Sequence, residues 1–277
     1  MLRLRYNSAV IKAKKGTNMK VFREPQHYID WESVGGYEKF MADYKNCPDY
    51  NQRRILIESL PLQTNPKWLA ERRCHITCST MKDFLGMDRT GKKPGAGYKK
   101  VVKRLVSEQV GWSEAELTWN EKASCKRGLL FERRALELFE QETGIKLKTD
   151  IGFVSDDIDG LPLGYSPDAY AGDANTQKFD CLAEVKSYEL NRILDELEVL
   201  HSPDVCEQMQ GGMFIANCPR CYKILYCAEL DKIFYLKYTR GLDFANRLHE
   251  RIPVAIEYKK EIEHNLTYTD LTDKIME

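Results

Sequence analysis

The sequence has 277 residues, of which 43% are hydrophobic and 30% charged, a composition typical of globular rather than disordered proteins. Its 42 Lys and Arg balance its 42 Asp and Glu, and the pI near 7.0 excludes a uniformly basic nucleic-acid binder. No stretch of the sequence approaches the roughly 20 consecutive apolar residues that a membrane-spanning helix needs.

The first residues and the cysteines indicate a compartment. Met1–Ser8 lacks the apolar core of a signal peptide, so we expect a protein that is not secreted. Nine cysteines in such a chain indicate reduced thiols. The expected location is the cytoplasm, or a host nucleus or other cytosol-like reducing compartment.

Residues 1–60 are predicted to form an N-terminal helical extension, followed by a main domain over residues 61–277. Asp30–Tyr44 has a helical pattern that a pair of glycines interrupts. Tyr50–Leu60 is a second predicted helix, which ends before a proline. The extension suggests no chemistry of its own.

Positive charge is concentrated between Arg72 and Arg104. This segment contains ten Lys and Arg but only two Asp, which gives it a local charge of +8. Such a patch can hold nucleic-acid phosphates, and the alternative is a solvated loop and helix face. Within it, Gly86–Gly97 is a glycine-rich loop that carries Lys92 and Lys93 and lacks the spacing of a P-loop. The loop is either a contact to a nucleic-acid backbone or a mobile connector.

A predicted helix over Pro66–Arg73 leads into a short polar segment. Thr77 or Ser79 is positioned to cap the next helix, Thr80–Leu85. A helix N-terminus beside hydroxyl groups and Arg72 can also bind an anion. An ordinary N-cap with surface arginines is the alternative.

The clearest predicted helix is Leu129–Thr143, which ends at Gly144. Apolar residues lie three, four and seven positions after Glu132, so this carboxylate is predicted to lie on or beside the inward face. It is either paired with a neighbouring arginine or part of a site. Two short strands, Ile145–Val154 and Gly160–Tyr165, are predicted to follow and to be joined by an acidic turn.

Two carboxylates further along the chain carry the strongest chemical signal. Asp168 follows a Ser-Pro pair, whose turn would direct its side chain from the end of the preceding strand. Cys181–Val185 is predicted to be a buried strand, and alternation places Glu184 and Lys186 on one face of it. Two carboxylates form an oxygen site of the kind that Mg²⁺ prefers, and the lysine could orient water or stabilise phosphate charge. The alternative is a buried Glu–Lys pair or solvated hairpin charges.

Helical patterns resume at Tyr188–Leu200 and Asp204–Ile215. In the second, Gln208 lies three and four positions before Gly211 and Gly212, a small-residue face that permits close packing. The amide of Gln208 could hold a substrate or a water molecule near the carboxylates.

Cys218 and Cys221 have the spacing of half a zinc knuckle. A structural zinc needs four ligands, and the nearby candidates, His201, Cys206 and Cys227, do not form a second pair with this spacing. We therefore expect a tight turn between a helix and a strand. A zinc- or cluster-bearing module is the alternative.

The order of these motifs resembles the YqaJ-type viral recombinase family, which includes the phage lambda exonuclease, within the PD-(D/E)xK nuclease fold. The likeness covers about residues 66–240. In chain order it is carried by Trp68 with Arg72, Ile76–Ser79, Gly128, Phe131 with Glu132, Thr143 with Gly144, Ser166–Asp168, Glu184–Lys186, and Gln208 with Gln210.

The resemblance implies a catalytic role for each matching position. Asp168 and Glu184 are similar to the family's Mg²⁺ ligands, helped by the backbone carbonyl of Val185. Lys186 resembles the catalytic lysine beside the attacking water, and Glu132 is similar to the helix carboxylate that completes the site. Mn²⁺ is expected to replace Mg²⁺.

A second group of positions is implied to bind DNA. Arg72 and Ser79, with Thr77 between them, resemble the residues that receive the 5′-phosphate of a DNA end. Lys92 and Lys93 are expected to contact the duplex backbone for a different reason, their place in the basic glycine-rich loop.

Gln208 is similar to the glutamine beside the family's site, but other positions depart from the pattern. Ala169 replaces the glycine usual after the aspartate, and Val205 and Cys206 stand where an aromatic residue is frequent. The gap between Asp168 and the strand carboxylate is also longer than usual. None of these changes removes an expected metal ligand.

The expected fold is therefore α/β, a PD-(D/E)xK nuclease fold with a mixed central sheet flanked by helices, preceded by the helical extension. The expected activity is Mg²⁺-dependent 5′-to-3′ exonuclease digestion of linear duplex DNA ends in viral or phage-type recombination or repair. The resemblance also implies a single-strand annealing protein as partner and a homotrimer. A nicking or structure-specific endonuclease and a non-catalytic DNA-binding scaffold are the alternatives.

Overall fold

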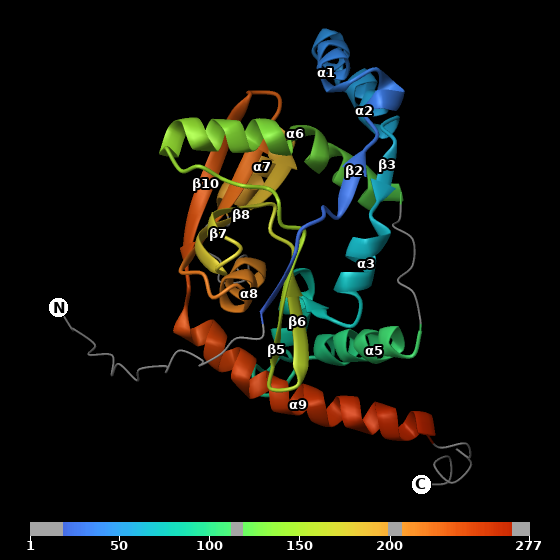
Figure 1. Cartoon of the computed structure of the whole chain (residues 1–277), viewed down its shortest axis with the longest axis vertical. Coiled ribbons are helices and arrows are strands. Elements are labelled where there is room, and N and C mark those ends of the chain that lie inside the picture. The colour runs from blue at the N-terminus through green and yellow to red at the C-terminus, as the bar shows by residue number, and fades with distance from the viewer. Residues whose placement is uncertain (1–18, 112–118, 199–206, 268–277) are drawn as a thin grey trace, which may run out of the picture.

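The computed structural model describes residues 19–111, 119–198 and 207–267 as a mixed α/β structure with two four-stranded sheets and a two-stranded ribbon (Figure 1). The first sheet has the order β10-β9-β8-β7. Its strands are β7 (Ala169–Asp173), β8 (Lys178–Tyr188), β9 (Arg220–Cys227) and β10 (Lys232–Thr239). The buried strand expected around Cys181–Val185 is thus confirmed as the centre of the longer β8.

The two faces of β8 pack against different cores. Cys181, Ala183 and Val185 belong to a cluster that includes residues of α6 (Trp119–Thr143), whereas Leu182 belongs to the other large cluster. Alternation therefore directs Glu184 away from the face of β8 that packs on α6. On either side β8 pairs with β9 in parallel and with β7 in antiparallel orientation.

The second sheet has the order β1-β5-β6-β4, with β1 (Lys20–Phe22), β4 (Ile76–Thr77), β5 (Phe153–Ile158) and β6 (Leu161–Tyr165). β5 and β6 form a hairpin whose two turn residues have positive φ, 56° at Asp159 and 88° at Gly160, as a type I′ turn requires. β4 lies parallel to β6, with Thr77 opposite Gly164. This register places the polar segment after β4 beside the chain that leads to Asp168.

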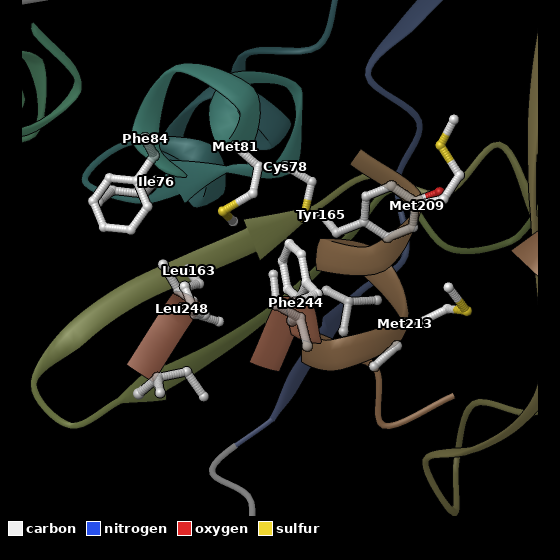
Figure 2. Packing of buried hydrophobic residues seen from close by; sticks show 14 of the residues in the cluster. Ile76, Cys78, Met81, Phe84, Leu163, Tyr165, Met209, Met213, Phe244 and Leu248 are labelled. Carbon is white, nitrogen blue, oxygen red and sulfur yellow. The ribbon is translucent and has the colours of Figure 1, made fainter. Parts of the chain in front are cut away.

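Helix α8 (Glu207–Ile215) lies between the two sheets and contacts strands of both. A Cβ atom at Gly211 would lie 2.7 Å from Cys78 Sγ, and one at Gly212 would lie 2.7 Å from the Tyr165 ring. The close packing expected of these glycines is confirmed. Figure 2 shows the surrounding core, in which Met209 and Met213 of α8 lie near Tyr165.

A group of helices covers the second sheet: α3 (Pro66–Arg72), the 3₁₀ turn η2 (Cys78–Thr80), α4 (Met81–Leu85), α5 (Gly97–Gln109) and α9 (Leu242–Thr267). α3 begins at a proline, and the side chain of Asn65 caps it by accepting from the amides of Lys67 and Trp68. α9 runs along the lower end of the molecule in Figure 1 and packs against α5.

At the opposite end lie the ribbon of β2 (His27–Ile29) and β3 (Leu62–Thr64), the 3₁₀ turn η1 (Glu32–Val34), α1 (Tyr37–Asn46) and α2 (Tyr50–Glu58). The interruption expected in Asp30–Tyr44 is confirmed, since Gly35 and Gly36 have φ of 80° and 99° and separate η1 from α1. Phe40 and Tyr44 share a hydrophobic core with α6 and the first sheet. The proposed boundary near residue 60 stays a prediction.

One expectation about strands is wrong, and one strand was not predicted. Residues 145–152 form no strand apart from a single bridge between Lys148 and Tyr170, and β5 begins at Phe153 and includes most of the acidic segment. β7 was not predicted, because four of its five residues, Ala, Ala, Gly and Asp, have a low preference for strands. The segment forms a strand by pairing with β8.

The two helices predicted on either side of residues 199–206 are α7 (Leu190–Glu198) and α8. His201, Val205 and Cys206 lie outside the described residues. Among those described, no helix is both long and apolar enough to cross a membrane.

Candidate active site

Asp168 lies in the connection between β6 and β7, where both its backbone and its side chain bind β8. Its amide donates to the carbonyl of Ala183, 3.2 Å away. Its Oδ2 accepts from the amide of Val185 at 2.6 Å. The Ser-Pro turn therefore directs this carboxylate against the edge of β8, one residue from Glu184.

Glu184 is held by three donors from three different elements. Its Oε1 accepts from Lys186 Nζ and from Gln208 Nε2, both at 2.7 Å, and its Oε2 accepts from Tyr165 Oη at 2.9 Å. The residue is only 3% exposed. A buried carboxylate is stable when hydrogen bonds and a cation compensate it, and Glu184 has both.

Glu132 on α6 adds a third carboxylate to this cluster. Burial, followed by repulsion from Glu184, raises its pKa to about 7, while Lys186 opposes the shift. Burial and repulsion from the other two carboxylates also hold the pKa of Asp168 well above its usual range. Attraction to Glu184 raises the pKa of Lys186.

The charges of this cluster do not balance. Glu132, Asp168 and Glu184 face the single ammonium of Lys186; burial, and after it repulsion among the carboxylates, raises the pKa of Glu132 and Asp168. A cluster of oxygen donors with excess negative charge fits a hard divalent cation such as Mg²⁺. In the described part of the chain, no three His, Cys, Asp or Glu side chains form a ready-made metal cage. Mg²⁺ commonly uses only one or two carboxylates, together with waters and substrate phosphates.

The cluster opens into a cleft of about 650 Å³. Its walls come from the ribbon, α6, the β6–β7 connection and the end of β8, and include His27, Arg127, Glu132, Asp168, Val185, Lys186, Tyr188 and Arg192. Glu184 and Gln208 do not line it; Glu184 lies behind Lys186, from which it accepts a hydrogen bond, and Gln208 donates to Glu184.

Arg72, Thr77 and Ser79 form a second polar group. Arg72 Nη2 donates to Thr77 Oγ1 at 3.5 Å, and the hydroxyls of Thr77 and Ser79 are 3.1 Å apart. The Arg72 guanidinium lies 5.1 Å from the ring centre of Trp68. The expected N-cap is wrong, since neither hydroxyl caps η2 or α4. The hydroxyls instead face the arginine, at the edge of β6 that leads to the carboxylates.

Lys92 and Lys93 lie elsewhere. Both are exposed and neither lines the cleft. Their amides approach Asp88 Oδ1 at 3.2 and 3.4 Å, which folds the loop on itself. Arg251 of α9 anchors the base of this loop by donating to the carbonyl of Phe84 at 2.6 Å.

Cys218 and Cys221 are both buried, Cys218 in the turn expected between α8 and β9 and Cys221 in β9 itself. Burial raises the pKa of the Cys218 thiol to about 12 and that of Cys221 well above its ordinary value. Among the described residues, no three His, Cys, Asp or Glu side chains come together here in an arrangement that could hold a metal.

Four residues around the cleft were not found from the sequence. Tyr165 could have been noticed as an aromatic strand residue just before the Ser-Pro pair, where alternation admits contact with Glu184. His27, Arg127 and Arg192 have no local motif, because only the tertiary structure brings the ribbon, α6 and α7 to the cleft.

No protein-family model and no curated protein sequence matches the chain. Solved structures do match it. LHK-Exo, an alkaline exonuclease from Laribacter hongkongensis, has a TM-score of 0.56 and 19% identity over 73% of this chain and 98% of its own. LHK-Exo in complex with dAMP gives 0.56 and 21% over 72% and 95%. A phage related exonuclease from Haemophilus somnus 129PT gives 0.53 and 14% over 70% and 97%. Over most of its length, the chain therefore shares its fold with alkaline and phage-related exonucleases.

Proposed function

We propose that the chain is a metal-dependent deoxyribonuclease of the PD-(D/E)xK fold that digests linear duplex DNA from the 5′ end. The observation that carries the proposal is the network in which Lys186, Gln208 and Tyr165 hold Glu184 beside Asp168. The similarity of fold to solved exonucleases, one of them in complex with dAMP, supports it.

Asp168 and Glu184, with the backbone carbonyl of Val185, would hold Mg²⁺, which Mn²⁺ should replace. When bound, the metal would activate water and neutralise charge on the phosphate. Both oxygens of Glu184 already accept hydrogen bonds. To bind a metal, Oε1 would have to release one of its two donors, Lys186 or Gln208.

The protein's own groups divide the remaining work. A carboxyl group with a pKa of about 7 is partly ionised at neutral pH, so Glu132 can accept a proton from an attacking water. The raised pKa of Lys186 keeps its ammonium charged, where it stabilises negative charge on the phosphate. Gln208 fixes Glu184 and, through it, the position of Lys186.

Arg72, Thr77 and Ser79 are proposed to bind the terminal 5′-phosphate. An arginine and two hydroxyls supply charge and donors suited to phosphate oxygens. The basic segment from Arg72 to Arg104, including Lys92 and Lys93, would bind the duplex backbone outside the cleft, which makes binding sensitive to salt. A single-strand annealing partner, a homotrimer and a role in recombination or repair are further proposals from the family resemblance.

Digestion of linear duplex DNA with Mg²⁺ tests this function, with 5′-phosphorylated and 5′-hydroxyl ends compared and a closed circle included. We expect rapid loss of the phosphorylated DNA and an intact circle. Arg72→Gln should reduce the preference for the phosphorylated end by roughly tenfold, corresponding to the loss of a charged hydrogen bond. The exposed neighbour Arg73, changed to Gln, is the control. Cleavage of the circle would indicate an endonuclease, and no cleavage at all would indicate a binding scaffold.

A further inference from the structure

A second pocket, of about 490 Å³, lies between α1, α2 and α6. It is lined by Tyr44, Pro48, Asp49, Tyr50, Arg53, Arg54, Ile57, Glu58, Ala123, Ser124, Arg127, Glu189 and Glu229. Its size is in the range of ligand sites, roughly 300–1,000 Å³. Half of its wall comes from the N-terminal helices, for which the sequence suggested no function.

The pocket adjoins the catalytic cleft. Ser124, Arg127 and Glu189 line both spaces. The hydroxyl of Tyr50 on α2 donates to Glu189, which follows β8 directly and lies three positions after Lys186. A strand that separates from the duplex at the mouth of the cleft and runs past this wall would therefore reach the second pocket.

Arg127 stands at the junction with donors to spare. Its side chain is 17% exposed, and Nε and Nη2 are buried without a hydrogen-bond acceptor among the described residues. The nearest carboxylate, of Glu229, is 3.6 Å from Nη2 and too far for a good hydrogen bond. The guanidinium also lies 5.6 Å from the Phe131 ring centre. Buried donors of this kind are normally satisfied. Because the side chain as a whole is partly exposed, the guanidinium can turn towards a phosphate at the pocket, which supplies the missing acceptors.

Aromatic rings accompany the arginines along this path. Tyr50 is 48% exposed at the pocket. Arg53 lies 5.6 Å from the ring centre of Tyr44, and in the cleft Arg192 lies 5.5 Å from that of Tyr188. Stacking surfaces combined with cations are typical of sites for single-stranded nucleic acid. Paired bases in a duplex have both faces covered by their neighbours, so only an unpaired strand can use such rings.

The carboxylates of the pocket would repel the phosphates of a single-stranded nucleic acid less strongly than their number suggests. Asp49 accepts from the amide of Gln52 at the start of α2, and Glu58 pairs with Arg54 at 2.7 Å. Glu189 accepts from Tyr50, and Glu229 accepts from the thiol of Cys227. Each is engaged within the chain, whereas two nitrogens of Arg127 have no acceptor in the described structure.

We propose that this pocket binds the unpaired strand of the DNA end, the strand that is not digested, with a phosphate at Arg127 and a base on Tyr50. The proposal rests on the nuclease function and gives the N-terminal helices a part in it. In this proposal, α1 and α2 hold the undigested strand apart from the digested strand in the cleft.

Binding measured by fluorescence anisotropy in EDTA, where no metal supports cleavage, tests the proposal. The probes are a blunt 5′-phosphorylated duplex and the same duplex with a 3′ single-stranded tail. Wild-type protein should bind the tailed DNA more tightly. Tyr50→Ala and Arg127→Gln should each lower the ratio of tailed to blunt affinity by roughly five- to tenfold. For Tyr50 this is the effect of a base that loses its stacking partner, and for Arg127 that of a phosphate that loses a charged hydrogen bond.

Two matched controls accompany these variants. Tyr28→Ala removes a tyrosine of similar exposure, 44%, that hydrogen bonds with Gln63 on the ribbon. Arg134→Gln changes an arginine of the same helix that pairs with Asp231 outside both spaces. Neither should change the ratio. If Arg127→Gln does not fold, the exposed Tyr50 still decides the matter.

An unchanged ratio in Tyr50→Ala, or an equal loss for blunt and tailed DNA, would overturn the proposal. Failure of the nuclease proposal has a different signature. In that case wild-type protein would cut neither DNA in Mg²⁺, while the tail-dependent binding in EDTA would remain and would still depend on Tyr50 and Arg127.

Discussion

Glu184 and Arg127 are charged residues near one cleft, but Glu184 is buried and Arg127 half-buried, and their partners differ. Glu184 receives three hydrogen bonds from the chain, whereas Arg127 has two buried nitrogens without an acceptor in the described structure. Within the chain, the hydrogen bonds of Glu184 are therefore already made; we call Glu184 and its donors Tyr165, Lys186 and Gln208 the floor of the proposed catalytic centre. Arg127 lies on the wall shared with the second pocket, and we expect the substrate to supply the hydrogen-bond acceptors that its guanidinium lacks. From this difference we expect the proposed catalytic residues to be positioned before the substrate binds. The residues proposed to bind the unpaired strand would form their hydrogen bonds only when that strand is present.

Removing a group from the floor should give the largest effect. Lys186→Ala deletes both the cation beside the phosphate and a donor to Glu184. We expect digestion of linear duplex DNA to slow by about 10²–10⁴-fold, the range for loss of a positioned catalytic group. Lys178→Ala, at the exposed end of the same strand, is the control. An unchanged rate in folded Lys186→Ala would show that this network is not the catalytic centre.

The floor also depends on close packing behind it. In Gly212→Ala the added Cβ would meet the Tyr165 ring at 2.7 Å and push α8 away from the strand that carries the Tyr165–Glu184 bond. We expect the free energy of unfolding to fall by about 1–3 kcal/mol and activity to fall with it. Urea denaturation measures the first effect.

Gly128→Ala is the matched control for this change, since a Cβ atom added at this position of α6 would have nothing within 4 Å of it. It should raise helix stability slightly, by roughly 0.5–1 kcal/mol. Equal stability changes of the same sign in both variants would contradict the packing argument.

His27, on the ribbon side of the cleft, should make the folding stability depend on pH. Burial, and then the charge of Arg72, lowers the pKa of His27 from 6.5 to about 4. His27 is therefore neutral in the folded chain but takes up a proton below about pH 6.5 when unfolded, so folding stability is lost as pH falls from 6.5 towards 4. Between pH 7.5 and 5 this group should cost about 2 kcal/mol of stability.

His27→Gln should remove that contribution, so the difference in unfolding free energy between variant and wild type should shift with pH. Urea denaturation at pH 7.5 and 5 measures it. A difference that stays constant across this range would mean that His27 is not shielded as its position in the ribbon implies.

The sequence predicts the floor because its signals are local. Alternation in one strand fixes the relation of Glu184 to Lys186, a Ser-Pro turn positions Asp168, and two glycines allow α8 to bring Gln208 close. These relations span few residues and depend on backbone geometry alone. The family resemblance adds the order in which they occur.

The wall is not predictable in this way. His27 reaches the cleft through a two-stranded ribbon whose strands are more than 30 residues apart in sequence, and Arg127 meets Tyr50 only after α2 packs on α6. Residues 145–152 show the converse error, since a segment in which apolar and polar residues alternate resembles a strand but has only one bridging partner. Strand formation depends on neighbours that a single sequence does not identify.

The most direct test of the central claim is calorimetric titration of Mn²⁺ into wild-type protein and Asp168→Asn. Three carboxylates facing one ammonium are expected to form a site for a divalent cation. Wild-type protein should bind Mn²⁺, and the loss of one charged ligand should weaken binding by at least roughly tenfold. Equal affinity in the two proteins, both folded, would contradict the assignment of this cluster as the metal site.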